Sequence, residues 1–180
     1  GSIKNTQLIC YAKSLIKNLQ IIEQPNGGLL SARNTLIKNC KTKFSVFLDW
    51  DDIIKENYLK LTLRAMNNAY EDCNAVITDR CNFADSSERI RRFLLGDEEH
   101  LSQNDFRMTS LIETSCLKSI GFRHDIRNGE ADDWSFWLDF FYSGYKAIHL
   151  PKFLFFYKFY HGSMSWPWSE GQKVGTAKLV

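Results

Sequence analysis

The sequence predicts a single α/β domain whose mixed, mostly parallel sheet is flanked by helices. Helical and strand-like patterns alternate through the first half of the chain, which favours parallel strands joined by helices. The 180 residues are enough for one compact core and few for two. Apolar residues make up 44% of the chain and aromatic residues 14%, which excludes general disorder.

Helices are predicted where apolar residues recur with the helical period, and strands where short apolar runs stand between turns. The predicted helices cover residues 8–19, 29–40, 59–70 and 134–141. The predicted strands cover residues 19–23, 44–48, 75–78, 146–149 and 153–159. The run at 44–48 is nearly unbroken, as expected of a central strand covered on both faces. Residues 82–105 carry many charges and are interpreted as a long loop or a helix.

The charge balance and the cysteines argue against two classes of protein. A net charge of +2 is too small for nonspecific nucleic-acid binding, which needs a strong basic excess. The five cysteines are scattered and lack C-x-x-C spacing, so we expect reduced thiols, no zinc site and a cytoplasmic location. The cluster Arg89, Arg91 and Arg92 leaves peripheral association with the inner face of the cell membrane open, although a solvated face is the simpler interpretation.

Three carboxylates follow the apolar run at 44–48. Asp49, Asp51 and Asp52 stand where an open parallel sheet places its ligand crevice. Asp49 and Asp51 are two residues apart and point the same way on an extended chain. Since two close anions repel each other unless a cation joins them, we expect them to bind Mn²⁺ or Mg²⁺. The alternative is that these acids cap the next helix, a role that suits Asp52 best.

A set of motifs, taken in order, resembles the family 2 inverting glycosyltransferases of GT-A fold. The matching segments are Gly1-Ser2-Ile3-Lys4-Asn5-Thr6, Asn26-Gly27-Gly28 with Ala32-Arg33-Asn34, Asp49-Trp50-Asp51-Asp52, Ile120-Gly121-Phe122, Asp132-Asp133-Trp134 with Trp137, Gly144-Tyr145-Lys146, and Tyr157-Lys158 with His161 and Ser163-Met164-Ser165. Each motif is short, but together they span nearly the whole chain. Two of them depart from the family pattern: the I-G-F segment lacks one glycine, and Asp132 replaces a glutamate.

The resemblance implies a fold and a substrate class. The fold would be a GT-A-type, Rossmann-like mixed sheet, and the donor would be a nucleotide-diphosphate sugar, with UDP favoured by family habit. The acceptor would be a hydroxyl group of a saccharide or glycoconjugate, in polysaccharide or glycoconjugate biosynthesis. The resemblance assigns Asp51, Asp49 and His161 to the metal, and Arg33, Asp49 and Asn26 to the nucleotide side.

The same resemblance implies that Asp133 is the general base, with Asp132 beside it on the acceptor side. Inversion needs one carboxylate that takes the proton of the attacking hydroxyl group. A position in the first turn of the helix at 134–141 favours its charged form. The alternatives are that both acids only favour the helix dipole, or that Glu130 takes the place of Asp132 beside the base. Trp134 and Trp137 have helical spacing and are expected in the core rather than against a sugar.

The family begins with a strand, a helix and a second strand that this sequence lacks, so the expected fold is N-terminally truncated. We expect residues 1–180 to form one glycosyltransferase-like domain. Residues 1–79 would be the remainder of the nucleotide-sugar-binding half, and residues 80–180 the half that binds the acceptor and carries the base. An uncovered sheet edge invites pairing, which leaves oligomers open. The rival interpretations are a catalytically idle GT-A-like module that binds sugars or proteins, and another phosphate-handling enzyme.

Overall fold

A computed structural model describes residues 6–69, 72–90, 106–123 and 132–161 of the chain. Its helices are α1 (Thr6–Leu15), α2 (Gly28–Asn39), α3 (Tyr58–Asn67), α4 (Thr114–Ile120) and α5 (Asp132–Tyr142). Its strands are β1 (Phe44–Ser45), β2 (Ile53–Ile54), β3 (Ala75–Ala84), β4 (Arg89–Ile90), β5 (Leu111–Glu113) and β6 (Ala147–Phe159). None of the helices in these ranges is long and apolar enough to cross a membrane.

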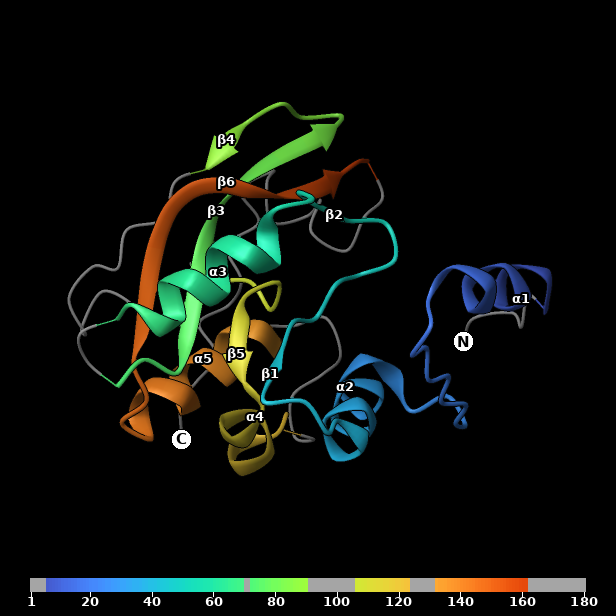
Figure 1. The fold of residues 1–180 in the computed structure, drawn as a ribbon, viewed down its shortest axis with the longest axis horizontal. Helices are drawn as coiled ribbons and strands as arrows, with labels where there is room; N and C mark the ends of the chain where they lie inside the picture. Colours follow the sequence, from blue (N-terminus) through green and yellow to red (C-terminus); the bar gives the residue numbers. More distant parts are fainter. Residues whose placement is uncertain (1–5, 70–71, 91–105, 124–131, 162–180) are drawn as a thin grey trace.

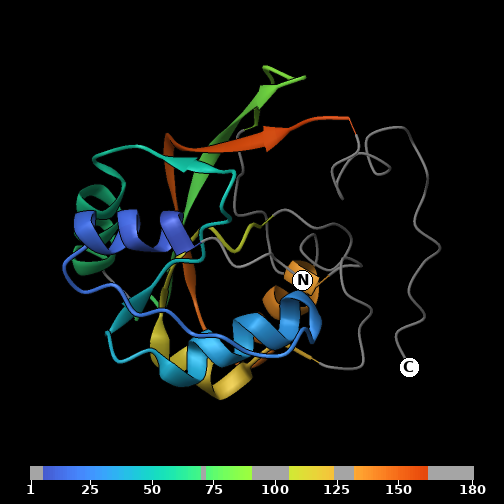
Figure 2. The ribbon, with the colours of Figure 1, turned by 90° about the vertical axis from the view of Figure 1, so that its right-hand side faces the viewer.

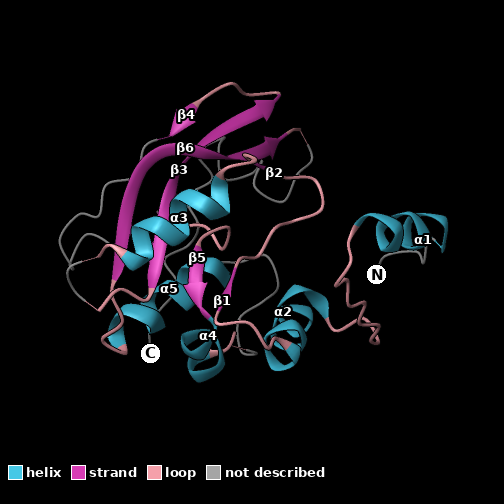
Figure 3. Cartoon of the chain, viewed as in Figure 1, coloured by secondary structure: helices cyan, strands magenta, loops and turns pink. Residues whose placement is uncertain are grey.

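The strands form one mixed sheet in the order β1-β5-β3-β6-β2, with β4 beside β3 (Figure 3). The longest pairing is parallel and joins β3 to β6 from Ala75↔Ala147 to Ala84↔Phe159. The other pairings are antiparallel and short. The predicted mixed α/β sheet flanked by helices is therefore confirmed. The expected boundary between residues 79 and 80 lies inside β3, so the two halves of the domain share a strand.

Helices cover both faces of this sheet, with α3 on one side and α5 on the other (Figures 1 and 2). Along β3, the alternation of side chains divides the core. Ala75 and Ile77 belong to the larger cluster, which includes Trp137 of α5, and Val76 belongs to the smaller cluster with Met66 of α3. The central strand covered on both faces is therefore β3. The prediction for residues 44–48 is wrong, because β1 is short, half-buried and at the end of the sheet order.

Two further element predictions also need correction. Residues 19–23 form no strand, and α1 ends at Leu15. The apolar stripe of α1 is exposed rather than buried, since Tyr11 is 62% and Leu15 66% accessible. Figure 1 shows α1 apart from the sheet. The helical period correctly predicts an apolar face, but it does not provide a surface against which that face can pack.

The predictions for the later strands were too short. The segment expected at 75–78 continues to Ala84 and then pairs with β4, which lies in the stretch interpreted as a loop or helix. The two segments at 146–149 and 153–159 are one strand, β6, which runs through Pro151. The register of β3 against β6 shifts on either side of Asp79, opposite Pro151 and Lys152. An irregularity of this kind accommodates a proline, which has no N–H to donate to the ladder.

Candidate active site

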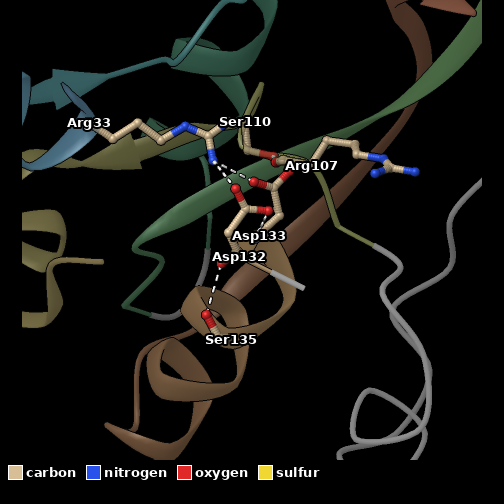
Figure 4. Close-up of polar contacts among 6 residues, drawn as sticks. All are labelled: Arg33, Arg107, Ser110, Asp132, Asp133 and Ser135. Atoms are coloured by element: carbon tan, nitrogen blue, oxygen red, sulfur yellow. Dashed lines mark hydrogen bonds and ion pairs between the residues drawn. The ribbon is translucent and has the colours of Figure 1, made fainter. Parts of the chain in front are cut away.

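Two acidic segments that are far apart in the sequence meet at a buried arginine. Arg33 extends from α2, and its Nη1 lies 2.6 Å from Oδ1 of Asp133 and 3.8 Å from Oδ2 of Asp132 (Figure 4). Both aspartates stand in the first turn of α5, as the sequence predicts. There the helix N-terminus favours negative charge. The structure therefore places Arg33 against Asp133, the proposed base.

The environment of Arg33 is apolar except for these acids. The residue is 5% exposed, and its guanidinium carbon lies 5.7 Å from the ring centroid of Phe47 and 5.3 Å from that of Phe122. Burial alone would lower the pKa of Arg33. The hydrogen bond to Asp133 and the charges of Asp133, Asp132 and Asp49 outweigh that effect, so the pKa is raised. Arg33 consequently stays charged at all pH values at which the fold persists.

Asp49 connects the turn after β1 to the same cluster. Although Asp49 lies at the surface, the protein around its carboxyl group raises its pKa. The charges of Asp133 and Asp51 raise this pKa further, and the charge of Arg33 opposes them. Burial and the neighbouring charge of Asp133 likewise raise the pKa of Asp132. The Asp49–Asp52 turn and the start of α5 thus lie within electrostatic range of each other.

Asp52 does not cap a helix, so the alternative of a capping role is not supported for this residue. The residue at the start of α3 is Asn57, whereas Asp52 Oδ1 accepts the backbone N–H of Lys158 at 2.9 Å. This bond ties the acidic turn to β6. Burial raises the pKa of Asp52 to about 6, with the charges of Asp49 and Asp51 adding to the shift and the bond to Lys158 and the charge of Arg107 opposing it.

Asp52→Asn is expected to stabilise the protein at pH 7.5 in the absence of divalent cations. A carboxyl group whose pKa is raised by folding contributes stability that is present below about pH 4 and is lost as the pH rises through about 6. The asparagine keeps the acceptor for Lys158 and removes the buried charge. After allowance for solvent screening the gain is about 1 kcal/mol, or about 2–4 °C in Tm. Thermal unfolding between pH 4 and 8 should show this gain shrinking toward pH 4. The exposed control Glu56→Gln should show no such trend, and an equal gain at all pH values would contradict the assignment.

Two other predicted ligands, His161 and Asn26, make hydrogen bonds that involve the backbone. His161 donates its backbone N–H to Oδ2 of Asp85 at 2.8 Å. Asn26 Oδ1 accepts the backbone N–H of Gly28 at 3.2 Å and so helps to start α2, where Gly28 adopts a φ of 81°. The structure thus gives Asn26 a local structural contact. Glu130 and residues 163–165 lie outside the described residues.

The carboxylates of the turn suit a metal ion that shares its ligands with a substrate. Within the described ranges, no three His, Cys, Asp or Glu side chains form a group that could hold a metal ion by themselves. Mg²⁺ typically binds through one or two carboxylates and completes its octahedron with water and substrate phosphates. Asp49 and Asp51, two residues apart on one turn, match that donor set.

Asn34, which the analysis of the sequence did not assign, holds Arg33 in place. Its Nδ2 donates to the carbonyl of Phe122 at 2.9 Å, and its Oδ1 accepts the N–H of Phe122 at 2.8 Å. Gly121, just before, has a φ of 67°, in the region that favours glycine. In the A-R-N motif, Arg33 therefore binds Asp133, and Asn34 bonds α2 to Phe122, which follows α4. The adjacency of the two in the motif is the signal that could have identified Asn34.

Asn34→Ala is expected to lower the free energy of unfolding by about 2 kcal/mol, because it removes two hydrogen bonds and leaves the partly buried peptide groups of Phe122 unpaired. Denaturant unfolding monitored by circular dichroism would measure this loss. Asn39→Ala is a matched control, since the exposed Asn39 on the same helix bonds only within α2. Equal losses in the two variants would contradict the role given to Asn34.

Trp137 packs in the core with Phe136 and Phe140 of α5, as predicted, whereas Trp134 is half-buried. Trp137 is 1% exposed and contacts the rings of Phe106, Phe136, Phe140 and Phe141. This cluster anchors α5 and so fixes the direction of its first turn. The interpretation of Trp137 as a core residue rather than a sugar-stacking surface is confirmed.

Comparison with known proteins agrees with this geometry. The model of glycosyl transferase family 2 matches residues 1–147. Two glycosyltransferases of Streptococcus pneumoniae serotype 4 are similar in sequence: GlyA is 28% identical over 167 residues, covering 83% of this chain and 24% of GlyA, and GlyG is 27% identical over 138 residues, covering 76% of this chain and 40% of GlyG. The chain thus spans well under half the length of these relatives.

A solved structure shows the same fold. Residues 1–349 of TarS from S. aureus, crystallised in complex with UDP-GlcNAc, superpose with a TM-score of 0.67 at 20% identity, covering 89% of this chain and 48% of that one. A second TarS structure has the same TM-score at 19% identity and covers 88% of this chain and 30% of its own. The predicted GT-A-type fold is confirmed. With a family match over most of its length and this shared fold, the chain belongs to glycosyl transferase family 2.

Proposed function

We propose that this chain carries the active site of an inverting glycosyltransferase that moves a sugar from a nucleotide-diphosphate donor to an acceptor hydroxyl group. The observation that carries the proposal is the meeting of the Asp49–Asp52 turn and the Asp132–Asp133 pair around Arg33. Membership of glycosyl transferase family 2 supports the reaction class. A UDP-sugar is the proposed donor, because the structurally similar TarS was crystallised with UDP-GlcNAc. The proposed acceptor is a saccharide or glycoconjugate.

In this proposal Asp133 is the general base. Its Oδ1 accepts a hydrogen bond from Arg33, which leaves Oδ2 to take the proton of the acceptor hydroxyl group as that oxygen attacks the anomeric carbon. Attack from the face opposite the departing diphosphate inverts the anomeric configuration. Asp132, whose pKa is raised by burial and by Asp133, sits one residue before the base and contacts the acceptor side.

Asp51 and Asp49 would hold Mn²⁺ or Mg²⁺, with Asp49 also reaching toward the donor. When bound, such an ion neutralises charge that develops on the departing diphosphate. His161 is proposed as a further ligand on the strength of the motif alone. This role is separate from that of the base, which is assigned to Asp133 at the start of α5.

A ligand-binding experiment tests the proposal directly. Thermal unfolding is measured with UDP-GlcNAc, GDP-mannose and dTDP-glucose, each with Mn²⁺, with Mg²⁺ and with EDTA. A donor at 100 times its Kd stabilises the folded state by about 2.7 kcal/mol, which raises Tm by about 5–11 °C for a domain of this size. Uridine, which lacks the diphosphate, is the control. The absence of a metal-dependent shift with every donor would favour the idle binding module.

A further inference from the structure

Arg33 offers a function that the resemblance to the family does not assign. We infer that Arg33 is a positioning residue of the general base: its guanidinium fixes Oδ1 of Asp133 and thereby directs Oδ2 to the acceptor hydroxyl group. The inference rests on the proposed function and names a new part of the same site. It also replaces the assignment of Arg33 to the nucleotide with an assignment to the acceptor side of the reaction.

The position of the guanidinium is set by the fold and not by a substrate. Arg33 is 5% exposed, and the rings of Phe47 and Phe122 lie within 6 Å of its guanidinium carbon. The next residue, Asn34, is bonded twice to the backbone of Phe122. A side chain confined in this way holds its partner at a constant place. A general base gains from such confinement, because a displacement of about 1 Å can cost about 100-fold in rate.

The contact with Arg33 gives the two carboxylate oxygens of Asp133 different surroundings. Nη1 lies 2.6 Å from Oδ1, a short, charge-assisted hydrogen bond. Within the part of the chain that the structure describes, Oδ2 of Asp133 has no hydrogen-bond partner. One oxygen is therefore held by the protein and the other is available to a hydroxyl group. Figure 4 shows both carboxylates of the pair turned toward the same guanidinium.

The charges around Asp133 explain why the held oxygen needs a cation. The charged groups that face it are Asp132 on its own helix, Arg33 from α2 and Asp49 from the turn after β1. Two neighbouring carboxylates resist double ionisation, and a close cation restores it. Arg33 thus fixes the geometry of the base and also offsets the repulsion between Asp133 and its acidic neighbours.

The test compares Arg33→Lys and Arg33→Met with the wild-type protein, using UDP-GlcNAc and Mn²⁺ with a saccharide acceptor. Arg33→Met is expected to lower kcat about 100-fold and to leave the Kd of the donor unchanged. Arg33→Lys keeps the charge but loses the planar fork, so its kcat should also fall at an unchanged donor Kd, but by less than in Arg33→Met. Lys38→Met, on the exposed side of α2, is the control.

A double variant separates this role from a general loss of structure. If Arg33 acts through Asp133, Arg33→Met combined with Asp133→Asn should be no slower than Asp133→Asn alone, because the two residues act as a unit. Should Arg33→Met fail to fold, Arg33→Lys alone decides, by the fall in kcat at constant donor Kd. A rise in donor Kd with kcat intact would overturn the inference and restore Arg33 to the nucleotide. Failure of the proposed function would look different, since the wild-type protein itself would then bind no donor.

Discussion

Asp133→Asn is expected to abolish sugar transfer while donor binding is retained. The substitution leaves the oxygen that Arg33 can bind but removes the group that accepts the proton of the attacking hydroxyl. General base catalysis contributes about 100-fold to 10,000-fold, so kcat should fall by that factor. Release of UDP from a UDP-sugar in the presence of a saccharide acceptor measures the rate, and the metal-dependent rise in Tm measures donor binding.

Asp139→Asn is the matched control for that experiment, because Asp139 stands on α5 two turns beyond the base. Its transfer rate should equal that of the wild-type protein. Full activity in Asp133→Asn would show that the base lies elsewhere. If activity were then lost in Asp132→Asn, the role would pass to the neighbouring carboxylate, whose Oδ2 lies 3.8 Å from the same Arg33 nitrogen.

Asp51→Asn is expected to remove the dependence of donor binding on Mn²⁺ or Mg²⁺. An amide is a weaker ligand than a carboxylate for a hard divalent cation and carries no charge. Loss of a residue that merely supports a metal ligand typically costs about 10–100-fold in affinity or activity, and loss of a ligand should exceed this. The measurement is a calorimetric titration of the donor at fixed metal concentration and again in EDTA.

In the wild-type protein the two titrations should differ strongly, and in Asp51→Asn they should nearly coincide. Asp72→Asn, which changes an exposed acid away from the site, should behave as the wild-type protein does. If Asp51→Asn kept full metal dependence, the cation would have to bind elsewhere on the protein, and the role given to the Asp49–Asp52 turn would be wrong.

Local patterns predicted the elements that make most of their own contacts. The spacing of Trp134, Trp137 and Phe141 predicts α5, and the acids just before that stripe fall in its first turn. The same method failed for α1, whose apolar face is as regular but lies exposed. Periodicity reports which side of a helix is apolar. Whether another element covers that side depends on contacts between distant parts of the chain, which a local pattern does not contain.

In the candidate site, too, local patterns predicted some residues, while others depend on contacts between distant parts of the chain. The turn at Asp49–Asp52 and the pair at Asp132–Asp133 could be found as motifs, because each is contiguous in the sequence. The partner of Arg33 could not, since it lies 100 positions away and is brought to α2 by the packing of α4 against both α2 and α5. The role of Asp52 could not be predicted for a similar reason: it accepts a hydrogen bond from Lys158, which becomes visible only when β6 lies beside the acidic turn.

Two adjacent residues of α2, Arg33 and Asn34, fix Asp133 and Phe122, and so fix both ends of the chain between them. Asn34 bonds to Phe122, and Arg33 bonds to Asp133. The chain between Phe122 and Asp133 is therefore held at both ends by neighbouring residues of α2. Exchanges, insertions or deletions among the intervening positions can therefore leave Asp133 where it is. Under the proposed function, a protein anchored in this manner can evolve toward new acceptor alcohols without moving its base.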